Sequence, residues 1–240
     1  MKKIVSLLIA ITLLFGLSAC SKVDKNYGVT EDVVSSSEAL TAKDESSEII
    51  SLDQKMSNYF DITLFDEENY SEIYLGKKFE YDVTYDGCNI TVPQKMEKFL
   101  KSGWQLAEGS SYNENSLIFA KETVSLNFVN QNGAVIWALF YNSSNQSMKL
   151  IDCQIVKFKI DNNLQANEDY KKFDVNNITN DSSVIELIDI LGTPSHFYQV
   201  TDNDYYFDYF LTKKDRRNKI RVYVNLFDDA ITSIEFSYYK

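Results

Sequence analysis

One histidine and three cysteines are the residues of this 240-residue chain best suited to chemistry. A histidine-based catalytic dyad or triad would have to use His196, but no nucleophile motif accompanies it. His196 follows Pro194 after a predicted helix, so we expect an exposed loop histidine. Zinc sites with two or more histidines are excluded, and the cysteines lack the Cys-x-x-Cys spacing of a zinc site. The sequence therefore predicts a non-enzymatic protein with no catalytic residue, metal or cofactor.

Cys20 ends an N-terminal segment with a distinct pattern. Lys2 and Lys3 precede an apolar run over residues 4–19, and small residues ending in Ala19 stand directly before the cysteine. A charged start, an apolar middle and small residues at the end are the anatomy of a secretory signal peptide. The apolar run is short for a membrane span of about 20 residues, and polar chain follows it. We interpret residues 1–19 as a signal peptide.

The stretch Leu17-Ser18-Ala19-Cys20 resembles the lipobox of bacterial lipoproteins, in which Leu, a small residue and Ala or Gly precede Cys. The resemblance implies cleavage after Ala19 and a diacylglyceryl group on the Cys20 sulfur. Each buried methylene contributes about 0.8 kcal/mol, so two acyl chains such as palmitate anchor a protein stably where one does not. We therefore expect an extracytoplasmic protein anchored to the cell membrane by lipid.

Cys88 and Cys153 form a possible pair. Outside the cytoplasm two such cysteines can form a disulfide, which would stabilise the fold by about 2–4 kcal/mol. The alternative is two separate buried thiols. The sequence does not decide between them, because a disulfide depends on a specific geometry.

The charge of the chain limits its partners. The formal net charge is -11 and the sequence pI is about 4.6. A chain of this charge is repelled by nucleic acid phosphates and by anionic lipid surfaces. We expect no nucleic acid partner, and membrane contact only through the acyl anchor.

The elements that would position any site begin after residue 51. Residues 20–51 comprise the lipidated cysteine and a stretch rich in Ser, Asp, Glu, Lys and Thr, which predicts a disordered tether. Residues 52–165 are predicted to form a first domain and residues 166–240 a second. In each, a short helix ending at a glycine precedes or covers antiparallel strands with alternating apolar residues. The predicted fold class is α+β, with two small helix-on-antiparallel-sheet domains.

Two local patterns define these elements. Asp86-Gly87 between alternating segments predicts a hairpin, and Pro93 fits the first turn of a helix that stops at Gly103. In the second half, Ser183 and Glu186 form a capping-box pattern at the start of a helix that ends at Gly192.

A candidate binding face follows from the strand predicted over residues 220–226. If Val222 and Val224 face the helix, the alternate residues and the end of the next predicted strand point outward. Exposed aromatic and arginine side chains on a sheet face are typical of protein interfaces, and they also suit stacking on sugar rings. The alternative is ordinary cross-strand pairing without a ligand. The outward residues are Arg221, Tyr223, Asn225 and Tyr239.

Residues 178–238 resemble the small lipoprotein of the outer-membrane barrel-assembly machine and the β-lactamase inhibitor protein family, in which a helix ending in Leu-Gly-x-Pro precedes an antiparallel sheet. The matching stretches are Leu191-Gly192-Thr193-Pro194, the predicted aromatic strand at 205–209 and the closing run at 222–234. The whole chain also resembles uncharacterised two-domain lipoproteins of low-GC Gram-positive bacteria.

These resemblances carry over no catalytic residue. They imply a membrane-anchored protein-binding or scaffolding module whose partner is an envelope protein. The alternative function is a lipoprotein that binds a cell-wall glycan or a small solute.

Overall fold

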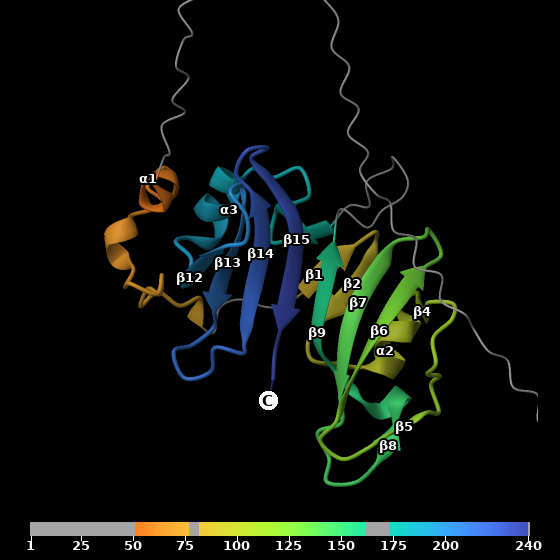
Figure 1. Cartoon of the computed structure of the whole chain (residues 1–240). Helices are drawn as coiled ribbons and strands as arrows, with labels where there is room; N and C mark the ends of the chain where they lie inside the picture. Colours follow the sequence, from red (N-terminus) through yellow and green to blue (C-terminus); the bar gives the residue numbers. More distant parts are fainter. Residues whose placement is uncertain (1–50, 77–81, 162–172, 240) are drawn as a thin grey trace, which may run out of the picture. The chain divides into compact units, whose positions relative to one another are not determined.

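Antiparallel β-strands make up most of the chain in the computed structural model, which describes residues 51–76, 82–161 and 173–239 (Figure 1). The signal peptide, Cys20 and the tether up to residue 50 lie outside these ranges. Strand makes up 42% of the structure and helix 15%. In the part described, no helix is long and apolar enough to cross a membrane.

The helices and strands follow one another along the chain in a fixed order. The order is α1 (Leu52–Met56), a 3-10 helix η1 (Ile62–Leu64), β1 (Asp82–Tyr85), β2 (Cys88–Thr91), β3 (Gln94–Lys95), α2 (Met96–Lys101), β4 (Trp104–Leu106), β5 (Leu117–Ile118), β6 (Thr123–Asn130), β7 (Val135–Tyr141), β8 (Met148–Lys149), a 3-10 helix η3 (Leu150–Asp152), β9 (Gln154–Asp161), β10 (Phe173–Val175), β11 (Ile178–Thr179), α3 (Val184–Leu191), β12 (His196–Gln199), β13 (Asp204–Phe210), β14 (Lys219–Asn225) and β15 (Ala230–Ser237).

The strands form one large and two small sheets. The large sheet has nine strands in the order β12-β13-β14-β15-β9-β7-β6-β4, with β3 pairing beside β9. A four-stranded sheet has the order β11-β10-β1-β2, and β5 pairs with β8. Both predicted domains contribute to the two larger sheets, because β15 pairs with β9 and β10 pairs with β1. The predicted boundary at residues 165–166 lies outside the described ranges, and the two-domain division stays a prediction.

The predicted fold class, α+β with two helix-on-sheet domains, is wrong: the fold is β-rich, and of its three helices only one has seven or more residues. The physical reason in the first half lies just after Pro93. The sequence placed Pro93 in the first turn of a helix, but Gln94 and Lys95 instead pair with β9 as strand β3. The helix that remains, α2, has six residues and is too short to cover a sheet.

The core lies against one face of the nine-stranded sheet. In Figure 1, α3, β1, β2 and α2 lie behind this sheet. As predicted, Val222 and Val224 of β14 face the core and are buried. Burying such side chains contributes about 1.5–3 kcal/mol each before entropy is subtracted. Ile220 of the same strand is also buried, and β9, β13 and β15 present equally buried residues to this core: Phe158, Ile160, Phe207, Ile234 and Phe236.

The segment before β1 reaches both faces of the large sheet at its β12 edge. The ring of Phe60 lies 5.6 Å from that of Phe197 in the core. Tyr70 instead stacks on His196, the neighbour of Phe197, at 4.2 Å between ring centroids. Successive strand residues point to opposite faces, so residues 60–70 pass around this edge.

The Asp86-Gly87 hairpin is confirmed. Tyr85 pairs with Cys88 across the turn, and both central residues have positive φ, 48° at Asp86 and 76° at Gly87. This combination defines a type I′ turn, whose twist matches that of the strands it joins.

The capping box at the start of α3 is also confirmed. Ser183 Oγ accepts a hydrogen bond from the Glu186 backbone N–H at 3.1 Å, and Glu186 Oε2 accepts one from the Ser183 N–H at 2.9 Å. Val184 and Leu187 of the helix are buried.

Ser183→Ala is expected to lower the free energy of unfolding by about 1 kcal/mol, because it removes the acceptor of a helix-end N–H. Urea denaturation followed by circular dichroism measures this loss. Asp189→Ala, at an exposed position of the same helix, is the control and should lose less. Equal losses in the two variants would show that the cap contributes nothing.

Candidate functional site

Three of the four predicted face residues lie on the side of the nine-stranded sheet away from the core. Arg221, Tyr223 and Asn225 are half-buried and alternate with buried Val222 and Val224, as the sequence predicts. Tyr239 follows the end of β15, and the guanidinium of Arg217 lies 5.5 Å from its ring centroid. We call this side the polar-aromatic face; its other members come from β7, β9, β12, β13 and β15.

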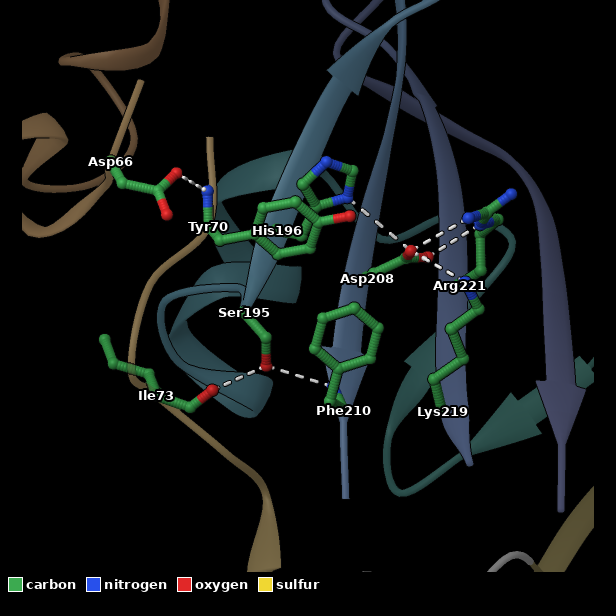
Figure 2. Close-up of polar contacts among 9 residues, drawn as sticks. All are labelled: Asp66, Tyr70, Ile73, Ser195, His196, Asp208, Phe210, Lys219 and Arg221. Atoms are coloured by element: carbon green, nitrogen blue, oxygen red, sulfur yellow. Dashed lines mark hydrogen bonds and ion pairs between the residues drawn. The ribbon is translucent and has the colours of Figure 1, made fainter. Parts of the chain in front are cut away.

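A buried carboxylate, Asp208 on β13, organises the face (Figure 2). Only 1% of Asp208 is exposed. Arg221 donates two hydrogen bonds to it, from Nε to Oδ1 at 2.6 Å and from Nη2 to Oδ2 at 2.8 Å. Lys219 Nζ donates to Oδ2 at 2.8 Å. Strand register explains the convergence, because Asp208 and Arg221 are cross-strand partners on β13 and β14.

The balance of charges sets the protonation state of Asp208. Burial alone would raise the pKa of this carboxyl, but the hydrogen bonds from Arg221, the contact with His196 and the charge of Lys219 together hold the pKa well below its ordinary value. Burial by itself would lower the pKa of Arg221, and the bond to Asp208 raises it instead. Both groups are therefore charged at neutral pH.

The prediction of an exposed loop histidine at position 196 is wrong. His196 is the first residue of β12, is 7% exposed, and its Nδ1 lies 3.6 Å from Asp208 Oδ2. The loop after α3 is short, and the strand begins two residues after Pro194. Stacking of Tyr70 on the imidazole ring completes the burial (Figure 2).

Ser195, the hydroxyl residue next to His196 in the chain, is engaged by other groups. The hydroxyl of Ser195 donates to the Ile73 carbonyl at 2.6 Å and accepts from the Phe210 N–H at 3.0 Å (Figure 2). The donor and acceptor roles of this hydroxyl are thus both taken by backbone groups, and the serine links the backbone at Ile73 to that at Phe210. The arrangement therefore supports packing rather than nucleophilic catalysis.

A row of aromatic rings lies beside the Asp208 cluster. Tyr198 stacks on Tyr206 at 5.2 Å, and Tyr206 contacts Tyr223 edge-on at 5.9 Å between ring centroids. Arg221 lies 3.8 Å from the Tyr206 centroid and Lys159 lies 4.7 Å from that of Tyr223. Tyr198 is 52% exposed, so the row ends in an accessible ring at the sheet edge.

The polar pattern continues across the sheet through paired residues. Arg221 pairs with Glu235, Glu235 with Lys159, and Lys159 with Trp137. Glu235 is only 6% exposed and forms an ion pair with Lys157 at 2.9 Å. Trp137 is half-buried, with Lys157 Nζ 5.6 Å from its ring centroid.

Sequence reasoning missed Tyr198, Tyr206, Asp208 and Trp137. A signal for Asp208 was present: it is the one charged residue within the aromatic run 205–210, and such a position has to find partners when the strand is buried. Trp137 lies in an almost wholly apolar run, but in the structure one face of β7 is buried and the other half-buried.

The remaining predicted site residues lie elsewhere. Cys88 and Cys153 are free thiols in the structure, Cys88 half-buried and Cys153 buried, and a disulfide between them stays one of two alternatives. Burial, with a contribution from Asp152, raises the pKa of the Cys153 thiol to about 11. Cys20 lies outside the described residues. Among those described, no group of three or more His, Cys, Asp or Glu could hold a metal ion.

Comparison of the chain with protein-family models, with curated proteins and with solved structures found no match.

Proposed function

We propose that this chain is a lipid-anchored, extracytoplasmic, non-enzymatic module that binds an envelope protein through its polar-aromatic face. The observation that carries the proposal is the tyrosine row Tyr198–Tyr206–Tyr223 beside Arg221. Tyrosine and arginine are the residue types enriched at the energetic centres of protein interfaces. The lipid anchor is the part of the proposal that rests on the lipobox alone.

The rigidity of this face favours binding. Arg221 is fixed to a buried carboxylate by two hydrogen bonds, and each tyrosine of the row contacts a neighbouring ring. Side chains that are ordered before binding lose less conformational entropy on association. A partner would meet accessible rings and cations whose geometry is already set.

A photo-crosslinking residue at position 198 tests the proposal in native membranes. We expect a discrete crosslinked protein partner from position 198 and none from position 185, because the two sites are similarly exposed, 52% at Tyr198 and 55% at Ile185, but Ile185 lies on α3. Crosslinks from both positions, or only to glycan, contradict a protein-binding site on this face.

Tyr223→Ala is expected to weaken binding of the crosslinked partner by about 2 kcal/mol, roughly 30-fold, as truncation of an interface tyrosine does. Binding is measured with the purified partner by calorimetry. The melting temperature is the control readout, because a residue that only supports the sheet would lower stability and leave the affinity of the folded protein unchanged.

A further inference from the structure

The two edges of the nine-stranded sheet differ in how they are covered. Unpaired backbone N–H and C=O groups at a sheet edge can pair with another chain, and native proteins usually block them. At the β12 edge the Phe197 N–H donates to the Asn69 carbonyl at 3.3 Å. Just before this strand, the Ser195 carbonyl accepts a hydrogen bond from the Ser71 N–H at 2.9 Å. The segment before β1 therefore covers the β12 edge.

The opposite edge, formed by β4 and β6, is covered only in part. β4 pairs with residues 128–130 of β6, and the Ala107 N–H after β4 donates to the Asn127 carbonyl at 3.0 Å. Beyond this bond the chain leaves the sheet (Figure 1). In the described part of the chain, no strand pairs with residues 123–126 of β6 on the side away from β7. We call residues 123–126 the open edge.

The alternation of hydrogen bonds along β6 shows which backbone groups point outward at the open edge. In an antiparallel sheet, successive residues direct their N–H and C=O groups to opposite neighbours. The Asn127 carbonyl points toward the β4 side, so the backbone groups of Ser125 and Thr123 point the same way. The Glu122 carbonyl points to the other side, where it accepts from the Asn142 N–H at 3.0 Å. No described residue forms a hydrogen bond with Ser125 or Thr123 on the outward side.

A cavity of about 300 Å³ lies at the open edge. Residues 125–127 form one side of it, and the loop over residues 107–112 forms the other. The Tyr112 N–H donates to Ser110 Oγ at 3.2 Å, so a hydrogen bond within the loop holds its shape. A wall that is ordered before binding loses less conformational entropy on association. The cavity leaves space beside Ser125 for another extended chain.

The charge of this region favours a basic occupant. Glu108 is the only charged residue of the cavity wall, and its side chain is exposed. Glu122 adds a second exposed carboxylate just before β6. Lys121 next to it donates instead to the Ser143 carbonyl at 2.6 Å. Opposite charges on neighbouring strands attract and like charges repel, so a second copy of this acidic chain fits the open edge less well than a basic segment.

We propose that the open edge binds an extended peptide segment of a partner protein, which adds a strand to the sheet and places a basic side chain beside Glu108. The backbone of this segment pairs with the outward N–H and C=O groups of Ser125 and Thr123. In strand addition, main-chain hydrogen bonds supply affinity and side-chain contacts supply specificity. No residue of the polar-aromatic face takes part, so this site and the function proposed above can fail separately.

The peptide Lys-Val-Lys-Val-Lys-Val, acetylated and amidated at its ends, is the probe. It is titrated by calorimetry into the full chain in detergent at physiological ionic strength, where salt screens nonspecific attraction. The same peptide methylated at every backbone nitrogen keeps the charge and donates no backbone hydrogen bond. We expect a Kd below about 1 mM for the probe and at least tenfold weaker binding of the methylated form. Absence of binding up to about 1 mM, or equal binding of the two peptides, overturns the proposal.

Ser125→Pro removes an N–H at the open edge. Proline is accepted on an edge strand where its nitrogen faces solvent, so we expect a small change in melting temperature and at least a tenfold loss of probe affinity. Leu126→Pro is the control, because Leu126 directs its N–H toward β7 and should be strongly destabilised. Unchanged probe affinity, or a loss of stability as large as that of the control, overturns the proposal. So does dimerisation of the wild type that Ser125→Pro abolishes, since it would assign the edge to a second copy.

Glu108→Gln and amide hydrogen exchange locate the bound probe without a proline. Glu108→Gln should weaken probe binding at least threefold. Glu114→Gln should not, because Glu114 is also exposed but does not line the cavity. In the wild type the Ser125 amide should exchange faster than that of Leu126, and the probe should slow it at least tenfold. Equal effects of the two glutamine variants, or unchanged exchange at Ser125 with the probe bound, overturn the proposal.

Discussion

Asp208→Asn is expected to lower the free energy of unfolding by about 3–5 kcal/mol, because removing one partner of a buried ion pair leaves the other charges uncompensated. In the folded protein Asp208 is 1% exposed and accepts hydrogen bonds from Arg221 and Lys219. The amide of asparagine has nearly the same shape as the carboxylate, but it carries no charge and cannot neutralise Arg221 and Lys219. For a chain of this size the loss corresponds to roughly 6–20 °C in melting temperature. Urea denaturation at neutral pH measures it.

Asp215→Asn is the matched control. Asp215 also pairs with an arginine, since Arg217 Nη2 lies 2.8 Å from its Oδ2, but the side chain of Arg217 is 69% exposed. An exposed pair contributes little, so we expect a much smaller change. If the two variants lose equal stability, the buried cluster around Asp208 is not the centre of this face that its geometry indicates.

The same cluster predicts a pH dependence. The folded-state pKa of Asp208 lies below its ordinary value of 3.8, so the carboxylate contributes stability that is fully present above the unfolded-state pKa. This contribution is lost as the pH falls through about 4 toward the lower folded-state pKa. The stability difference between the wild type and Asp208→Asn should therefore be constant near neutrality and shrink below about pH 4.

The local sequence pattern was sufficient to predict features formed by residues that are close together in the sequence. The Asp86-Gly87 turn, the capping box of Ser183 and the alternation along β14 each involve residues within a few positions of one another. Their conformations follow from backbone preference and from the two-residue period of a strand. The outward direction of Arg221 and Tyr223 was predictable for the same reason.

Long-range pairing was not predictable in this way. The contact of β9 with β15 joins segments about 75 residues apart and makes one sheet of what the sequence suggested were two. Burial of His196 depends on Tyr70, far earlier in the chain, and the role of Asp208 depends on its register with Arg221. The periodic pattern of apolar residues within a single strand or helix does not reveal which distant strands pair or which distant residues meet. The fold class and the centre of the site therefore emerged only from the structure.

Cys20→Ser is expected to have the largest effect on attachment of the protein to the membrane. The sequence predicts a diacylglyceryl group on the Cys20 sulfur and no other attachment to the membrane. A serine hydroxyl does not replace the thiol that accepts this lipid. Metabolic labelling with a fatty-acid probe should mark the wild-type chain and leave Cys20→Ser unlabelled. Two acyl chains account for stable anchoring at about 0.8 kcal/mol per buried methylene, so the variant loses this contribution entirely.

Cys88→Ser is the control for this experiment, because Cys88 is a half-buried thiol of strand β2 and should not affect labelling. The mass of the N-terminal peptide adds a second readout, since cleavage before a lipidated Cys20 removes residues 1–19. An uncleaved signal peptide could hold the serine variant at the membrane by its apolar run, and labelling together with the mass separates that case from lipid anchoring. A wild-type chain that carries no label, or a serine variant that keeps it, would refute the anchor.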